Sequence, residues 1–261
     1  MEFSLSCLPE KVHKSLIKQV YDNEILGHIG YDSTALIGRE KHLIKEGTRK
    51  ERKRLAGQRY LKEKKGELES RKQKQMKQSL NEMIDELPKM CDFGMKKNSQ
   101  GTATVWKGFK FHVAVDDMGI PISALLTSAS LNDCEAAIPL MVKTKSTVEN
   151  FYDLMDSAYD VDEIKEFSRS LGHVPIIDVN SRGVVQKKEN EAEAKKKNIL
   201  NTYTAEDIRY KQRFPKERFN SLFKEYYGGR NIQYKGHAKV FCHAMFGVLA
   251  YTAITFMRFN Y

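Results

Sequence analysis

Residues 106 to 119, WKGFKFHVAVDDMG, constrain the fold of this chain more than any other stretch. The large apolar side chains occupy every second position, at Phe109, Phe111, Val113 and Val115. This period of two is typical of a β-strand that buries one face. A turn-forming run from Asp117 to Gly119 leads into a second strand-like stretch, GIPISALLTSAS, so the two stretches predict a β-hairpin.

The segments on either side of the hairpin alternate between strand and helix patterns. Strands are predicted at 26–38, running out at Asp32, at 151–155, closed by Asp156, and at 173–180. Helices are predicted after a cap at Asn132 or Asp133, at 161–172, around Glu217 and at 240–257. This order predicts a single three-layer α/β domain with a central mixed sheet.

A basic stretch interrupts this pattern after the first strand. Residues 45–77 contain fourteen Lys or Arg and five Glu, with few large apolar side chains. Such a segment buries little surface, so it is a solvated helix, a flexible arm or a DNA-contacting insertion. An apolar period then predicts an amphipathic helix from Met76 that stops at Pro88. A second Lys/Glu-rich stretch, 186–198, is expected to be a solvated excursion.

Composition narrows the class of protein. The formal net charge is +10, which favours a polyanionic partner. The four cysteines are scattered, with no C-x-x-C pair, which argues against a zinc ribbon or a disulfide framework and fits a reducing cytosol. The apolar run 240–257 approaches the length of a membrane span, but His243 and Gly247 interrupt it. We therefore expect a buried C-terminal helix and no membrane association, and the first residues show no signal peptide pattern.

One polar helix face carries an unusual set of side chains. Tyr210, Arg213, Glu217 and Lys224 are spaced as Y-x2-R-x3-E-x6-K, which places them within an arc of about 60° on an ideal helix. An ordinary solvated face explains such an arc unless other carboxylates converge on Glu217. Asp32 and Asp156 are the candidates, because ligands collect beyond the carboxyl ends of strands in open α/β sheets.

Three converging carboxylates would need a positive charge to offset their repulsion. Mg²⁺ and Mn²⁺ prefer oxygen ligands, and two such ions can clamp a phosphodiester without a histidine base. Nearby Arg213, Arg218 and Lys224 would then contact phosphates. Asp153 and Asp160 flank Asp156 and are the alternatives for its role. Spacing alone does not select among these carboxylates.

The signature resembles that of the DDE transposases of bacterial insertion sequences, in the insertion sequence 4 group. GYDSTAL, residues 30–36, is similar to the family strand that carries the first aspartate, and DSAYD, residues 156–160, resembles the second-aspartate segment. The hairpin and helix between them also look like those of the family. The resemblance covers roughly residues 25 to 255.

The resemblance implies an RNase H-like fold and metal-dependent cleavage at element ends, followed by strand transfer into target DNA. It implies that Asp32, Asp156 and Glu217 hold two Mg²⁺ or Mn²⁺ ions. It implies that Tyr210, Arg213 and Lys224 hold DNA near the scissile phosphate. The expected partners are the terminal inverted repeats and the target DNA. A homodimer in the DNA complex and a cytoplasmic, nucleoid-associated location are also implied.

The expected organisation is a short, truncated N-terminal segment at 1–25 and an RNase H-like catalytic domain at 26–259, with the basic insertion at about 40–100. Family members usually carry a longer N-terminal region that recognises the inverted repeats. A truncated remnant that binds DNA without completing transposition is therefore a second hypothesis. A basic RNA-interacting protein with incidental carboxylates is a third, and the intact signature argues against it.

Overall fold

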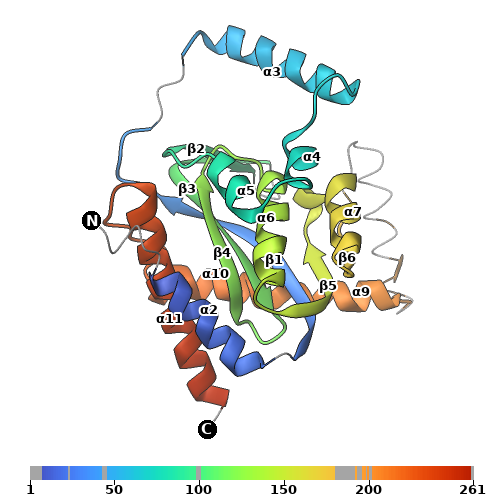
Figure 1. The fold of residues 1–261 in the computed structure, drawn as a ribbon, viewed down its shortest axis with the longest axis vertical. Coiled ribbons are helices and arrows are strands. Elements are labelled where there is room, and N and C mark those ends of the chain that lie inside the picture. The colour runs from blue at the N-terminus through green and yellow to red at the C-terminus, as the bar shows by residue number, and fades with distance from the viewer. Residues whose placement is uncertain are drawn as a thin grey trace.

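The computed structural model describes residues 8–259, apart from 23, 43–45, 98–100, 180–191, 193–195, 198, 200 and 201. Most of the stretch 186–198 therefore lies outside the described residues. A sheet is covered by helices on both faces, and α3 stands clear of the body (Figure 1). The elements in chain order are α2 (Leu8–Tyr21), β1 (Ile25–Ile37), α3 (Arg49–Lys64), α4 (Arg71–Gln75), α5 (Leu80–Glu86), β2 (Asp92–Lys97), β3 (Ala103–Asp116), β4 (Pro121–Ser128), α6 (Cys134–Lys145), β5 (Glu149–Met155), η1 (Ser157–Tyr159), α7 (Asp162–Ser170), β6 (Val174–Ile177), α9 (Ala205–Tyr210), η2 (Lys211–Arg213), α10 (Phe214–Tyr226) and α11 (His237–Phe259).

The sheet is mixed, as predicted. Its strand order is β2-β3-β1-β5-β6, with β4 also paired to β3. Strand β1 is antiparallel to β3 and parallel to β5, and β5 is parallel to β6. The predicted three-layer α/β fold is thus confirmed, and it is consistent with an RNase H-like architecture.

Strand β1 is longer than the sequence pattern indicated. It pairs with β5 only from Ile25 to Gly30 but continues along β3 from Ile29 to Ile37. Asp32 therefore lies inside β1, not at its end. The prediction that the strand runs out at Asp32 is wrong, because pairing with β3 holds the chain extended after β5 has ended.

Two apolar cores lie on opposite faces of the sheet. Helices α2, α5, α6 and α7 cover one face, with Ile17, Met83, Ile138 and Ile164 among the buried side chains. Helices α10 and α11 cover the other face. There Phe223 stacks on Phe111 of β3 at 5.2 Å between ring centroids. The sheet-facing side of α10 is thereby fixed against β1 and β3.

The C-terminal helix α11 belongs to the second core. It passes the length and hydropathy test for a membrane span over His237–Arg258, and half of the tested window is buried inside the molecule. Val240, Ala244, Met245 and Val248 pack in the core with Phe219 and Phe223 of α10. The predicted buried C-terminal helix is present.

The basic segment forms an exposed helix where the structure describes it. Helix α3 begins at a Thr48 capping box, in which Glu51 also accepts from the Thr48 backbone. No large apolar side chain of α3 is buried, and Leu55, Tyr60 and Leu61 are exposed. The amphipathic helix predicted from Met76 starts later, at Leu80, because Ser79 caps it.

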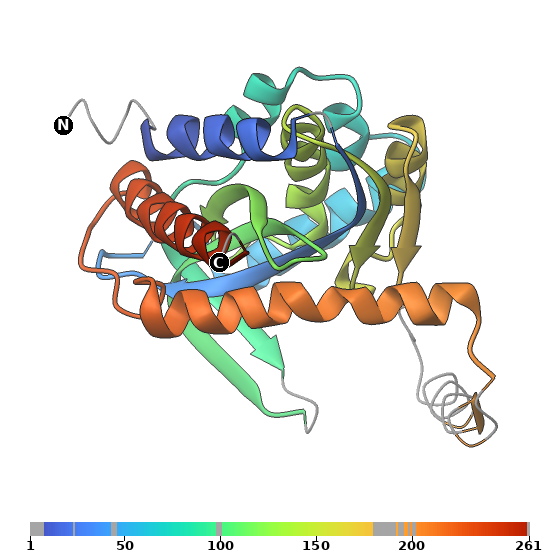
Figure 2. The same ribbon diagram turned by 90° about the horizontal axis from the view of Figure 1, so that it is seen from below.

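Two further expectations are modified. Asp133 does stand at the N-cap of α6, but its side chain makes no cap hydrogen bond and pairs instead with Lys110 at 3.0 Å. Strand β3 begins at Ala103, before Trp106, and pairs there with β2. The resulting two-stranded ribbon projects past α10 (Figure 2). Sequence reasoning did not predict β2.

Candidate active site

Three aspartates lie just beyond the last residue pairs that join three neighbouring parallel strands. Gly30 of β1 pairs with Leu154 of β5, and Met155 pairs with Ile177 of β6. Continuing these registers places Asp32, Asp156 and Asp178 side by side across the sheet. Neighbouring strands lie about 4.8 Å apart, and laterally aligned side chains share a face. We call these three residues the aspartate row; they face the side of the sheet that α10 crosses.

Asp32 is the most enclosed member of the aspartate row. Its Oδ1 accepts a hydrogen bond from the Ser33 backbone at 2.8 Å, and its Oδ2 accepts one from the Asn220 amide at 2.9 Å. Burial raises the pKa of Asp32, and the charge of Asp156 raises it further. The ammonium of Lys216 acts in the opposite direction and lowers it. The site thus brings two mutually repelling carboxylates together.

Asp156 lies where β5 gives way to a short 3₁₀ turn. Its Oδ1 accepts from the backbone of Ala158 at 3.0 Å, which starts the turn η1. The alternatives for its role are turned elsewhere. Asp153 is fully buried and is bonded to Tyr31, Asn150, Ser168 and His173. Asp160 pairs with Lys165. Neither stands in the aspartate row.

The Glu217 helix crosses the sheet beside the aspartate row. Helices α9 and α10, joined by the 3₁₀ turn η2, form one rod that runs under the parallel strands (Figure 2). Pro215 occupies the first turn of α10, as predicted. The sheet-facing residues are Lys216, which bonds the Tyr31 carbonyl oxygen at 2.8 Å, and Asn220, which reaches Asp32. They hold α10 against β1.

Three of the four signature residues contact one another along this rod. Arg213 donates to the Tyr210 hydroxyl at 2.9 Å and lies 3.9 Å from the Glu217 carboxylate. Burial raises the pKa of Tyr210 to about 12, and the charges of Asp178 and Asp156 add to the rise. Burial and then the charge of Lys96 lower the pKa of Lys224, whereas Asp32 raises it. Tyr210 and Lys224 therefore both lie in the field of the aspartate row.

Glu217 is near the aspartates but turned outward. Its side chain is 52% exposed. At about 100° per residue it points some 60° away from Asn220, the residue that reaches Asp32. Across the part of the chain that the structure describes, no three His, Cys, Asp or Glu side chains lie close enough to hold a metal ion. The structure thus brings Asp32 and Asp156 together, with Glu217 on the adjacent helix face.

The donor groups nevertheless fit a divalent cation. Aspartate oxygens are the ligands that Mg²⁺ and Mn²⁺ prefer. The repulsion between Asp32 and Asp156 is the kind that a cation relieves. In addition, the buried Oδ1 of Asn220 has no hydrogen-bond partner within the described structure. An oxygen beside Asp32 is therefore left over for a water or an ion.

Some of the basic side chains on α10 and on the β2–β3 ribbon lie near the aspartate row, and others do not. Lys96 comes from the β2–β3 ribbon, and its charge acts on both Asp32 and Lys224. Arg218 lies on another side of α10, where it lines a hollow with Tyr251 and Thr255. The predicted phosphate contacts at Lys224 and Arg213 are thus close to the aspartate row, whereas Arg218 faces α11.

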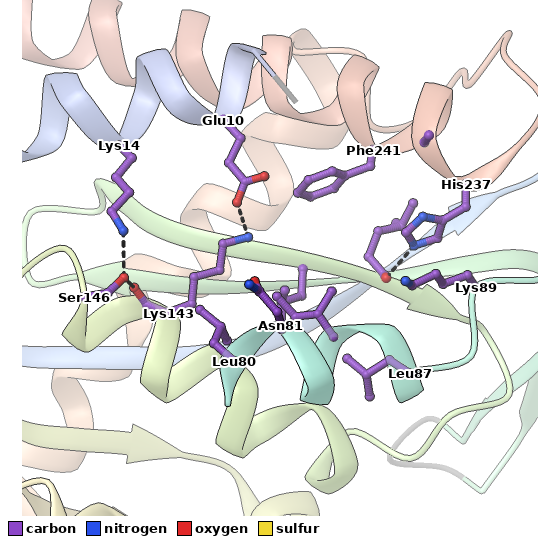
Figure 3. A pocket seen from close by; sticks show the side chains of 14 residues that line it. Glu10, Lys14, Leu80, Asn81, Leu87, Lys89, Lys143, Ser146, His237 and Phe241 are labelled. Carbon is purple, nitrogen blue, oxygen red and sulfur yellow. Dashed lines mark hydrogen bonds and ion pairs between the residues drawn. The ribbon is translucent and has the colours of Figure 1, made fainter. Parts of the chain in front are cut away.

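A large hollow lies away from the aspartate row (Figure 3). It measures about 590 Å³ and is formed by α2, α5, β4, α6 and α11, along β4 and between the helices of both layers. Its polar groups already have partners. Glu10 pairs with Lys143, Lys14 donates to Ser146 at 2.8 Å, and His237 contacts the Leu126 carbonyl oxygen at 2.7 Å. No member of the aspartate row lines it.

Sequence reasoning missed several residues of the site. Asn220 and Lys216 could not be picked out, because a helix pattern does not distinguish a buried polar side chain from a solvated one. Asp178 could have been found, since it lies near the end of the predicted strand at 173–180. His112 of β3 is also buried, with Nε2 at 2.8 Å from the Thr127 hydroxyl.

Comparison with known proteins adds one family. Residues 86–253, more than half of the chain, match the family model of the transposase DDE domain. The match includes Asp156, Asp178 and the whole stretch 210–224, and it begins after Asp32. No curated protein and no solved structure matches the chain.

Proposed function

Since the chain belongs to the family of DDE transposases, we propose that it cleaves DNA at the ends of an insertion element and transfers the freed ends into target DNA. We further assign it to the insertion sequence 4 group, on the spacing of Tyr210, Arg213, Glu217 and Lys224. The observation that carries the proposal is that Asp32 and Asp156 lie next to each other by register, just beyond the last residue pair of β1 and β5, and that the charges of Lys216 and Lys96 act on Asp32.

The catalytic residues of this proposal are Asp32, Asp156 and Glu217. These three carboxylates would hold two Mg²⁺ or Mn²⁺ ions, which supply charge neutralisation at the phosphate and a more acidic water. Glu217 points partly into solvent while it pairs loosely with Arg213. A rotation of its side chain away from Arg213 would bring the carboxylate toward Asp32, and this would free the guanidinium for a phosphate.

The remaining signature residues would position DNA. Arg213 can present its planar fork to a phosphate, which Lys cannot do. The charges of both Lys96 and Asp32 act on Lys224, so Lys224 suits a phosphate held next to the reacting bond. Tyr210 stays protonated at neutral pH and can donate a hydrogen bond to a phosphate oxygen. Arg218, on the side of α10 that faces α11, would contact DNA away from the aspartate row.

The proposed chemistry balances in two steps. First, a water oxygen forms a bond to phosphorus as the bond to the 3′ oxygen breaks; the water loses a proton and the 3′ oxygen gains one. This leaves a 3′-hydroxyl and a 5′-phosphate. Second, that 3′ oxygen attacks a target phosphodiester, whose own 3′ oxygen leaves with a proton. The number of phosphodiester bonds is unchanged in the second step, so no energy-rich cofactor is consumed.

The partners of the proposed reaction are double-stranded terminal inverted repeats and target DNA. Two ends must be held together, so we propose a homodimer in the DNA complex, acting on the nucleoid in the cytoplasm. Residues 26–259 would form the catalytic domain. The basic insertion at about 40–100, with the exposed helix α3, would add sequence-independent DNA affinity.

Metal-dependent nicking of a supercoiled plasmid tests the proposal. We expect nicking by the full chain with Mg²⁺ or Mn²⁺ and none with EDTA. Asp156→Asn should remove it, whereas Asp85→Asn, at an exposed carboxylate on the opposite helix layer, should not. Binding of DNA without nicking under any metal would favour the truncated remnant, and a preference for RNA would favour the third hypothesis.

A further inference from the structure

Lys216 is a buried cation in the middle of the candidate active site. Its side chain is only 3% exposed, although lysine is among the residues least often buried. Its Nζ donates to the carbonyl oxygen of Tyr31, the residue before Asp32. Its stem lies against Gly30, where an added Cβ would stand 3.0 Å from the Lys216 Cδ. Strand β1 thus leaves room for this side chain.

The charges around Lys216 explain why an ammonium is tolerated there. Burial lowers its pKa, while the carboxylates of Asp32, Asp156 and Glu217 favour the charged form. Reciprocally, Lys216 is the strongest cationic influence on the pKa of Asp32. A buried charge without a partner is costly, so the lysine and the aspartates each depend on the other.

We propose that Lys216 is a tethered counter-ion of the carboxylate site. Its ammonium offsets the charge of the Asp32–Asp156 pair before divalent ions bind, and it repels those ions when they arrive. This inference rests on the proposed function. Lys216 is a positioning residue, because it acts through Asp32 and through the attachment of α10 to β1. Its charge and its bond to Tyr31 keep the carboxylates aligned in the metal-free protein, at a cost in metal affinity.

The proposal predicts that replacing Lys216 changes metal affinity and catalysis in opposite directions. Removing the charge lets the aspartates attract a divalent ion without competition, so metal affinity should rise, on the order of tenfold. Removing the bond to Tyr31 loosens α10, so catalysis should fall. A residue with a merely structural role would lower both quantities or leave metal affinity unchanged.

The test is calorimetric Mn²⁺ binding to the full chain, with plasmid nicking measured in parallel. Lys216→Met and Lys216→Gln remove the charge, and the Gln amide can still donate toward Tyr31. Lys216→Arg keeps the charge. Lys143→Met is the matched control, because Lys143 also donates to a sheet carbonyl, that of Ala124 at 2.7 Å, but lies by the hollow away from the aspartate row.

We expect about tenfold tighter Mn²⁺ binding for Lys216→Met and Lys216→Gln, and wild-type affinity within about threefold for Lys216→Arg and Lys143→Met. Nicking should fall at least tenfold in Lys216→Met. If Lys216→Met does not fold, Lys216→Gln carries the test alone. Unchanged or weaker Mn²⁺ binding in the charge-removing variants overturns the inference. Failure of the wild-type chain to bind Mn²⁺ overturns the proposed function instead.

Discussion

The amide of Asn220 lies 2.9 Å from Oδ2 of Asp32, and it joins the Glu217 helix directly to the first aspartate across 188 positions of the chain. Together with Lys216, one turn earlier, it fixes where Glu217 stands along the aspartate row. Asn220 therefore sets the geometry of the site without being a carboxylate.

Asn220→Ala should reduce the nicking rate by about 10- to 100-fold, because a small misplacement of reacting groups greatly lowers the rate. The free energy of unfolding should fall by only about 1–2 kcal/mol, for one hydrogen bond to a charged group. Rates and urea unfolding curves measure the two effects. Asn150→Ala is the matched control, since Asn150 also bonds an aspartate of the sheet, Asp153, at 2.9 Å. It should cost stability and leave the rate of the folded protein intact; equal rate losses would contradict the assignment.

Two residues, Glu217 and Asp178, are candidates for the third metal-binding carboxylate of the site. Asp178 stands in the aspartate row by register, whereas Glu217 stands on α10 with half of its side chain exposed. If Glu217 is the third ligand, Glu217→Gln should lower metal-dependent nicking by roughly 100-fold or more, and Asp178→Asn by less than about tenfold. The measurement is the nicking rate as a function of Mn²⁺ concentration. The reverse order of effects would transfer the role to Asp178.

The fold was predictable because its signals are local. The alternation at Phe109, Phe111, Val113 and Val115 is set by the pleat of one strand, and Gly172 ends α7 at a positive φ of 85°, as its place in the pattern indicated. The end of β1 was not predictable, since it depends on which neighbour pairs with Asp32. Pairing with β3 is a contact between positions some 80 apart in the chain.

The site was predictable only in part, for a related reason. Asp32 and Asp156 could be named from strand patterns and family resemblance, although Asp32 lies inside β1 and not at its end. Lys216 and Asn220 could not, because the face of a helix that meets the sheet is fixed by tertiary packing of Phe219 and Phe223. An ideal wheel also placed Tyr210 on one continuous helix with Glu217, whereas a 3₁₀ turn separates them.

The β2–β3 ribbon should contact DNA through Lys96. No acidic residue occurs between Asp92 and Asp116, and the charge of Lys96 reaches Asp32 and Lys224. Lys96→Ala should weaken binding to a DNA duplex and lower the salt slope by about 0.9, the value for one lost phosphate contact. Fluorescence anisotropy at several salt concentrations measures both quantities. Lys11→Ala, exposed on α2, serves as the control, and an unchanged slope for Lys96→Ala would place DNA elsewhere.

Helix α3 should supply affinity that is independent of sequence. Lys53 and Lys62 are exposed on it. Replacing both with Gln should flatten the salt dependence by up to about 1.8 in slope, with similar losses on unrelated duplexes. The matched pair Lys11→Gln and Lys18→Gln on α2 should have less effect. Equal losses from both pairs would point to a general charge effect and not to a contact by α3.

Buried histidines should make the protein sensitive to mild acid. Burial lowers the pKa of His112 to about 4, from 6.5 in the unfolded chain. Because the folded pKa is the lower one, stability is fully present above pH 6.5 and is lost as the pH falls toward 4. The free energy of unfolding should fall between pH 7 and pH 4.5. His112→Gln should make this fall smaller by on the order of 2 kcal/mol, as measured by urea unfolding.

Asp116 provides a control of opposite sign for this titration. Burial raises its pKa to about 6, although hydrogen bonds from Tyr21, Ile120 and Met118 oppose the rise. A raised carboxylate pKa means that stability increases as the pH falls from about 6 to 4, so Asp116 partly offsets the histidines. Asp116→Asn should therefore steepen the acid loss that His112→Gln makes shallower. If both variants change the acid loss of unfolding free energy in the same direction, these pKa assignments for His112 and Asp116 are wrong.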